Sequence, residues 1–152
     1  MIRTIVTDIK ELRKPSEVVT KHDDIKAIIT DLKDTLIANP SGIGLSAVQI
    51  NVKKRISYLR IPKSKTEFDE YVLINPQISE KIGKACSFKE GCLSFKGIQV
   101  ITSRYVTVAV EYYDIDFIKI FKIFSGLEAI AVQHEIDHIN GICIFQRKHK
   151  AR

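Results

Sequence analysis

The stretch SGLEAIAVQHEIDHING, residues 125–141, decides the fold of this chain. One set of its residues recurs at helical spacing and would share one face of a helix, namely Leu127, Ile130, Ala131, His134 and His138. Ser125 followed by Glu128 matches the capping-box pattern, and Gly141 is a typical helix terminator. The sequence therefore predicts a helix over residues 125–139 with two histidines on one face.

Within this predicted helix, His134-Glu135-Ile136-Asp137-His138 is an H-E-x-x-H match. A spacing of four residues places the two imidazoles one turn apart, where both can reach one metal ion. Glu135 would lie beside them, close enough to move a proton on a metal-bound water. The alternative, two histidines hydrogen-bonded within the core, stays open from this motif alone.

A catalytic metal site with two histidines needs a third protein ligand. Only His149 and no acidic residue follows His138, so we expect that ligand upstream. Cys92, in the segment EGCLS (residues 90–94), is the candidate, because the adjacent Gly91 lets the backbone approach a ligand closely. A lone cysteine is otherwise more often a small core residue, which is how we interpret Cys86 and Cys143.

The rest of the chain predicts one mixed α and β domain. A first helix is expected over residues 23–38, capped by Asp23 or Asp24 and ended by the breakers in residues 39–42. Strands are predicted at residues 55–61, 71–74, 98–102, 105–113 and 117–124, with a loop over 62–70 and a turn at 113–116. Residues 42–49 show neither a strand nor a helix period.

Length and composition indicate a single globular domain. The chain has 152 residues, of which 45% are hydrophobic and 28% charged, and this composition argues against disorder. No apolar run approaches the roughly 18 residues of a membrane span, and no secretory signal is evident. Three cysteines without a close pair favour a reducing compartment.

Basic residues outnumber acidic ones, giving a net charge of +6. The C-terminal tail concentrates them in Arg147, Lys148, His149, Lys150 and Arg152. This tail could contact nucleic acid or a ribosome, but a solvated chain end is the simpler interpretation.

Three segments taken together resemble the signature motifs of peptide deformylase, in the correct order. They are GIGLSAVQ (residues 42–49), EGCLS (90–94) and QHEIDH (133–138). Residues 12–15, 72–76 and 139–141 also resemble the family at matching positions. The resemblance covers about residues 1–145, which would form the catalytic domain, and leaves residues 146–152 as a short basic tail. It implies an α+β fold, with mixed antiparallel sheets packed around a central metal-binding helix.

The resemblance also implies an activity, removal of the formyl group from the N-terminal formylmethionine of nascent polypeptides. Cys92, His134 and His138 would hold one divalent metal ion, Fe(II) in the cell, with Zn(II), Ni(II) or Co(II) also able to bind. A metal-bound water would attack the formyl carbon, with Glu135 as general base and then general acid. The Gln49 side-chain amide and the Leu93 backbone N–H would stabilise the oxyanion.

Substrate contacts follow from the same resemblance. The backbone of Gly44 would contact the formylated end, and the methionine pocket would be lined by Ile43, Leu127, Ile130 and Ala131. A Glu90–Arg104 ion pair would orient the loop that carries Cys92. Two departures from the family, the run Phe95-Lys96-Gly97 after Ser94 and Gln99 in place of arginine, would affect peptide preference. A third, Ser46 in place of alanine, places a hydroxyl beside the site that needs a hydrogen-bond partner.

The predicted partners are formylmethionine N-termini and, weakly through the basic tail, the ribosome. We expect a monomer without membrane contact in the cytoplasm of a bacterial or phage-infected cell, or a processed organellar form. Two other classes stay open, an H-E-x-x-H peptidase and a non-enzymatic ribosome-binding module. Retention of Gln49, Glu135 and all three metal ligands argues against the second of these.

Overall fold

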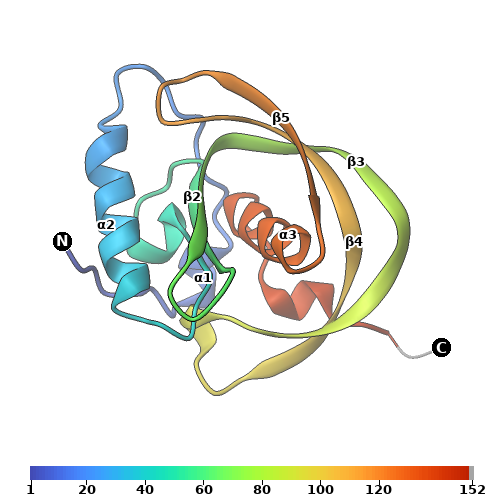
Figure 1. Ribbon diagram of the computed structural model, residues 1–152. Helices are drawn as coiled ribbons and strands as arrows, with labels where there is room; N and C mark the ends of the chain where they lie inside the picture. The colour runs from blue at the N-terminus through green and yellow to red at the C-terminus, as the bar shows by residue number, and fades with distance from the viewer. Residues whose placement is uncertain (151–152) are drawn as a thin grey trace.

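The structure, a computed structural model, describes residues 1–150 and has an α+β architecture, as predicted (Figure 1). Its helices are α1 (Ile9–Leu12), α2 (Ile25–Ile37) and α3 (Leu127–Ile139), with 3₁₀ helices η1 (Ala47–Ile50), η2 (Leu93–Phe95) and η3 (Ile144–Arg147). The strands are β1 (Gly44–Ser46), β2 (Ile56–Pro62), β3 (Phe68–Gly91), β4 (Gln99–Tyr113) and β5 (Lys119–Ser125). They form one antiparallel five-stranded sheet in the order β1-β2-β3-β4-β5, rather than several sheets.

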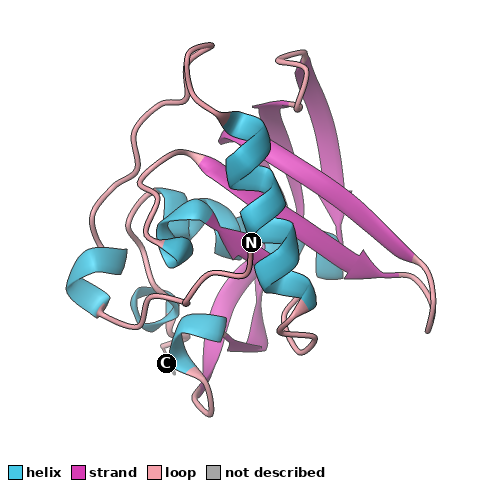
Figure 2. Ribbon diagram, turned by 90° about the vertical axis from the view of Figure 1, so that its left-hand side faces the viewer, coloured by secondary structure: helices cyan, strands magenta, loops and turns pink. Residues whose placement is uncertain are grey.

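Helix α3 lies at the centre of the molecule, with the curved sheet around it (Figure 1). Its apolar residues Val132 and Ile136 pack with Leu59, Leu73 and side chains of β4 in one buried cluster. On the other face of the sheet, α2 packs against β2 and completes a second cluster (Figure 2). Successive residues of β2 alternate between the two clusters because strand side chains point to opposite faces. The sheet thus separates α2 from α3 and encloses the metal-binding motif.

The predicted α2 is confirmed, and the start of α3 is corrected. The Asp24 side chain accepts a hydrogen bond from the Ala27 amide and caps α2, as expected. Ser125, in contrast, is the last residue of β5, and the N-cap of α3 is Gly126 with φ +65° and no side-chain cap. The predicted capping box is therefore wrong, because this strand-to-helix turn needs a backbone conformation that favours glycine.

The strand predictions were too short in the middle of the chain. Residues 71–74 belong to β3, which continues to Gly91, and the predicted loop 62–70 already contains the start of β3 at Phe68. The second half of β3 is mostly exposed, so its residues carry no apolar alternation that would reveal a strand. The predicted strands 98–102 and 105–113 are a single strand, β4, which pairs with β3 along its length.

Residues 42–49, which had no recognisable period, form the edge strand β1 and most of η1. Of the two cysteines interpreted as core residues, Cys143 is buried, as expected, whereas Cys86 is exposed on the solvent-facing half of β3. None of the helices within residues 1–150 has the length and apolar character needed to cross a membrane.

A candidate metal centre at the base of a deep cavity

Cys92, His134 and His138 converge in the interior of the protein. Their ligand atoms all lie within 4.8 Å of one another. The Nε2 atom of His138 is 3.3 Å from the Cys92 Sγ and 3.2 Å from the His134 Nε2. Ligand atoms at about 2.0–2.3 Å from one tetrahedral ion are separated by roughly 3.3–3.7 Å, so this donor set fits a single transition-metal ion.

Local structure explains how three residues from two distant segments meet. The histidines lie one turn apart on α3, as their spacing predicted. Cys92 follows the last residue of β3 and is the N-cap residue of η2, where its extended backbone ends the strand. The residue that follows the end of β3 thus presents its thiol to the histidines of α3.

The electrostatics of the site favour a positive charge at His134 and a neutral ring at His138. Burial by itself lowers the pKa of His134, but hydrogen bonds with Cys92 and Glu90 outweigh burial and raise it to about 10 in the metal-free protein. Burial and the neighbouring His134 charge hold the pKa of His138 well below its usual value. A bound cation would supply the charge that this environment favours, which agrees with the donor geometry.

The Glu90–Arg104 ion pair suggested by the sequence is present behind the metal ligands. Arg104 Nε donates to Glu90 Oε2 at 2.7 Å, and its NH2 group donates to Oε1 at 3.1 Å. The same Oε1 lies 2.9 Å from the Nδ1 of His134, and Thr102 donates to Glu90 as well. Glu90 therefore orients the His134 ring from a position near the end of β3, two residues before Cys92.

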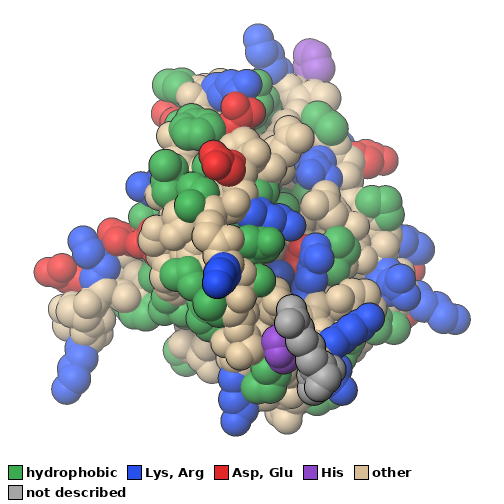
Figure 3. Space-filling view, turned by 90° about the vertical axis from the view of Figure 1, so that its right-hand side faces the viewer, with side chains coloured by type: hydrophobic (Ala, Val, Ile, Leu, Met, Phe, Trp, Pro, Cys, Tyr) green, Lys and Arg blue, Asp and Glu red, His purple; other side chains and the backbone are tan. Residues whose placement is uncertain are grey.

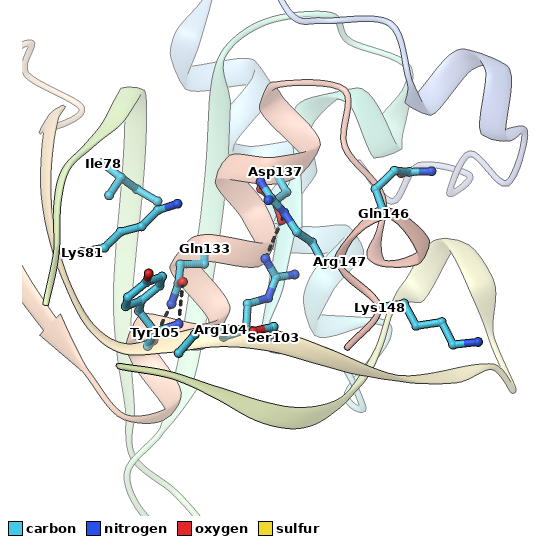
Figure 4. A pocket seen from close by; sticks show the side chains of 11 residues that line it. Ile78, Lys81, Ser103, Arg104, Tyr105, Gln133, Asp137, Gln146, Arg147 and Lys148 are labelled. Atoms are coloured by element: carbon cyan, nitrogen blue, oxygen red, sulfur yellow. Dashed lines mark hydrogen bonds and ion pairs between the residues drawn. The ribbon is translucent and has the colours of Figure 1, made fainter. Parts of the chain in front are cut away.

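Asp137 and Arg147 extend this network, and sequence reasoning missed both (Figure 4). Arg104 donates to Asp137, and the guanidinium of Arg147 binds both Asp137 oxygens at 3.0 and 2.9 Å. Asp137 precedes the candidate ligand His138, so Arg147 holds the end of η3 against the turn of α3 that carries this histidine. Arg147 is thus not part of a solvated tail, whereas Arg152 lies outside the described residues.

Glu135 lies at the centre of the site and is held by Ser46. The Ser46 Oγ donates to the Glu135 Oε2 at 2.6 Å and lies 2.6 Å from the Ser57 Oγ. Burial raises the pKa of Glu135, while the His134 charge and the Ser46 hydrogen bond oppose that rise. The serine that replaces the family's usual alanine is therefore fully hydrogen-bonded and contacts the catalytic candidate directly.

Gly44 packs directly against Glu135. A Cβ at position 44 would lie 2.8 Å from the Glu135 Oε1, which is closer than real Cβ contacts, and 3.0 Å from the Leu59 Cδ2, which is a tight contact. Gly44 is also the first residue of β1, the edge strand of the sheet. Only glycine leaves room here for both the strand and the carboxylate.

Gln49 directs its amide toward the metal ligands. It is 1% exposed, and its Nε2 donates to the Ser94 Oγ at 3.0 Å and toward the Cys92 Sγ at 3.6 Å. Its Oε1 accepts from the Ser46 amide at 2.9 Å, which fixes which end of the amide faces the sulfur. Leu93 is the first residue of η2, a position whose N–H has no acceptor within the helix.

A cavity of about 770 Å³ opens onto this centre. The predicted site residues that line it are Ile43, Gly44, Gln49, Cys92, Leu93, Leu127, Ile130, Ala131, His134 and Glu135. His138 is buried behind them. The structure therefore brings every predicted site residue to one cavity or directly beneath it. Their individual roles stay predictions.

Known proteins resemble the whole chain, not only this site. The family model described as polypeptide deformylase matches residues 2–152. A peptide deformylase of Clostridium beijerinckii is 41% identical, covering 95% of this chain and all of that protein. One of Aquifex aeolicus is 38% identical, covering 97% and 88%. The crystal structure of peptide deformylase from Ehrlichia chaffeensis superposes with a TM-score of 0.90 at 34% identity, over 99% and 89% of the two chains.

Proposed function

The chain belongs to the polypeptide deformylase family and is a hydrolase that removes the formyl group from nascent polypeptides, and we propose that Glu135 and a metal held by Cys92, His134 and His138 perform this reaction. The observation that supports this proposal most directly is that a buried carboxylate and three convergent metal-ligand atoms lie together, with Glu135, Cys92 and His134 in the lining of one cavity and His138 beneath it. When bound, a divalent ion would supply Lewis acidity and make a water more acidic.

Glu135 is the proposed general base and general acid. Its carboxylate accepts the proton of the attacking water and returns it to the methionine nitrogen as the formyl C–N bond breaks. Ser46 holds one carboxylate oxygen, and Gly44 leaves space beside the other. The reacting centre would therefore lie between Glu135 and the ligand cluster, next to the open edge of β1.

Attack on the formyl carbon creates a negatively charged oxygen that needs hydrogen-bond donors. We assign this task to the Gln49 Nε2 and the Leu93 N–H, which flank Cys92. The fixed orientation of the Gln49 amide supports the assignment, because donors that are already in place need no reorganisation in the transition state.

The methionine side chain would enter the apolar part of the cavity. Ile43 packs against the α3 core cluster, and Leu127, Ile130 and Ala131 contribute the adjoining face of the helix. The Gly44 backbone at the edge of β1 would bind the formylated end. We assign these contacts from cavity lining and from the predicted motif positions.

A single metal ion agrees with the family and the cluster, and we propose Fe(II) as the ion used in the cell. A donor set of one cysteine and two histidines also suits Zn(II), Ni(II) and Co(II). We further propose a catalytic domain over residues 1–145 that acts as a monomer in the cytoplasm.

Lysine and arginine side chains are spread over the face near the C-terminus (Figure 3), which supports a weak contact with ribosomal phosphates.

The test is formate release from a formyl-Met-Ala-Gln amide by protein prepared without oxygen and loaded with Fe(II) or Ni(II). We expect turnover that C92A abolishes together with metal binding, whereas C86A, which changes an exposed cysteine of β3, keeps both. E135Q should retain metal and lose turnover. Metal-loaded protein that cleaves internal peptide bonds and not the formyl group would instead favour a peptidase.

A further inference from the structure

The cavity extends beyond the metal centre and the proposed methionine pocket to a mouth between two chain segments. Ser41 and Gly42 line one side of it, and residues 95–99 line the other, together with Phe88 and Lys89 from β3. Because this part of the cavity lies outside the proposed methionine pocket, the residues that follow methionine would leave the site through it.

Two lysines line this cavity and are exposed at its mouth, Lys89 on β3 and Lys96 directly after η2. The Lys96 Nζ donates to the Asn39 Oδ1 at 3.0 Å. Asn39 lies two residues before the opposite wall, so the Lys96 ammonium is held between the two sides. Its partner is a neutral amide, and the charge is therefore not cancelled.

No carboxylate compensates these charges within the described residues that line the cavity. The lining carboxylates are Glu90 and Glu135, which are only 8% and 3% exposed. Glu90 is already paired with Arg104, and Glu135 faces the reaction site. The mouth therefore presents two positive charges to a peptide that leaves the site, and none of its described lining residues offers an exposed negative one.

We propose that Lys89 and Lys96 form a subsite that selects nascent peptides with an aspartate or glutamate among the residues after methionine. The inference rests on the proposed function, because it assumes that the formylmethionine end occupies the inner cavity. A carboxylate at the mouth is attracted to two ammonium groups, and a lysine there is repelled by them. Since these charges lie away from the reacting bond, selection acts mainly on KM and association.

The test compares three C-terminally amidated peptides, formyl-Met-Ala-Glu, formyl-Met-Ala-Gln and formyl-Met-Ala-Lys, on the metal-loaded enzyme. Amidation removes the terminal carboxylate, which would otherwise place a negative charge on all three. We expect kcat/KM to be about fivefold or more higher for the glutamate than for the lysine peptide at low ionic strength, carried by KM. At high salt the ratio should approach one, because the Debye length falls to about 3 Å at 1 M.

Charge variants assign the effect to the two lysines. The ratio should collapse in K89Q/K96Q and invert in K89E/K96E, whereas K84Q, an exposed lysine of β3 outside the cavity lining, should keep the ratio of the parent. Each ratio compares two peptides on one protein, so differences in folding or metal content between variants cancel.

The outcomes separate the subsite from the proposed function. Turnover of the glutamine peptide with a parental glutamate-to-lysine ratio near one, or a ratio that K84Q changes as much as K89Q/K96Q, would overturn the subsite and leave the deformylase assignment intact. Failure of the metal-loaded parent to release formate from the glutamine peptide would overturn the proposed function and this inference with it.

Discussion

The Ser46 hydroxyl and the Glu135 carboxylate form a buried hydrogen bond of 2.6 Å between the first and third sequence motifs. Because the single Ser46 proton points to Glu135, the Ser57 hydroxyl 2.6 Å away donates to Ser46 in turn. A chain of two serines from β1 and β2 thus holds the proposed base on α3. This contact links two strands of the sheet to the proposed base on the helix.

Replacing Ser46 with alanine removes this hydrogen bond and should shift the pH dependence of the reaction. Donation from Ser46 favours the ionised carboxylate, so its loss raises the pKa of Glu135. We expect the acid limb of the kcat/KM profile to move to higher pH in S46A, with kcat at neutral pH reduced by about tenfold or less. A pH profile that superposes on the parent profile would show that Ser46 does not tune the base.

G44A should remove activity by displacing Glu135. The added Cβ would lie 2.8 Å from the Glu135 Oε1, and either the carboxylate or β1 must move. We expect kcat to fall by about a hundredfold or more, with metal stoichiometry retained, since Gly44 contacts no ligand. The double variant G44A/E135Q should be no slower than E135Q alone. If the losses of kcat in G44A and E135Q were additive in the double variant, Gly44 would not act through Glu135.

Q49A tests the proposed oxyanion donor. Loss of one such donor costs about 2.7–4 kcal/mol of transition-state stabilisation in a comparable hydrolase, so kcat should fall by about 10²–10³-fold. S94A removes the hydroxyl that holds the Gln49 Nε2 but leaves the amide in place, and its loss should be smaller. Turnover of Q49A close to that of the parent would refute the role, provided that the metal content of both proteins is measured and equal.

R147Q should weaken the metal-binding turn from outside the site. Arg147 binds both oxygens of Asp137, the residue before His138, and is 39% exposed, so the pair contributes on the order of 1 kcal/mol. We expect a lower unfolding midpoint of the metal-free protein and faster metal release to a chelator. K148Q, a change in the next residue, whose side chain points away from Asp137 in Figure 4, serves as the control. Equal release rates for R147Q and the parent would contradict the positioning role.

The third motif could be interpreted from the sequence because its information is local. An i, i+4 pair of histidines on a predicted helix fixes their relative direction, and α3 confirms the helix. The boundaries of α2 and the glycine at the end of α3 followed from capping and turn chemistry for the same reason. At Ser125 the capping-box pattern conflicted with the strand and turn signals. Ser125 became the last residue of β5, and Gly126 became the N-cap of α3.

Long strands were less accessible to the sequence because pairing partners, not side-chain periodicity, stabilise them. The solvent-facing half of β3 has few apolar residues and is held by its ladder with β4, which reaches from Ile74 to Gly91. The pattern of one sequence does not show that this segment pairs with β4. It therefore predicts only four residues of β3 as a strand, and it wrongly predicts Cys86 as a core residue.

By itself, the sequence determined the α+β class, the metal-binding helix and the order of three motifs that share one cavity. Tertiary structure alone decided the contacts that couple those motifs. Ser46 to Glu135, Glu90 to His134 and Arg147 to Asp137 join residues between 10 and 89 positions apart. The first two pairs meet because the sheet packs around α3, and the third because η3 folds back against α3. The distance and direction of each hydrogen bond depend on that packing and not on the spacing of the residues along the chain.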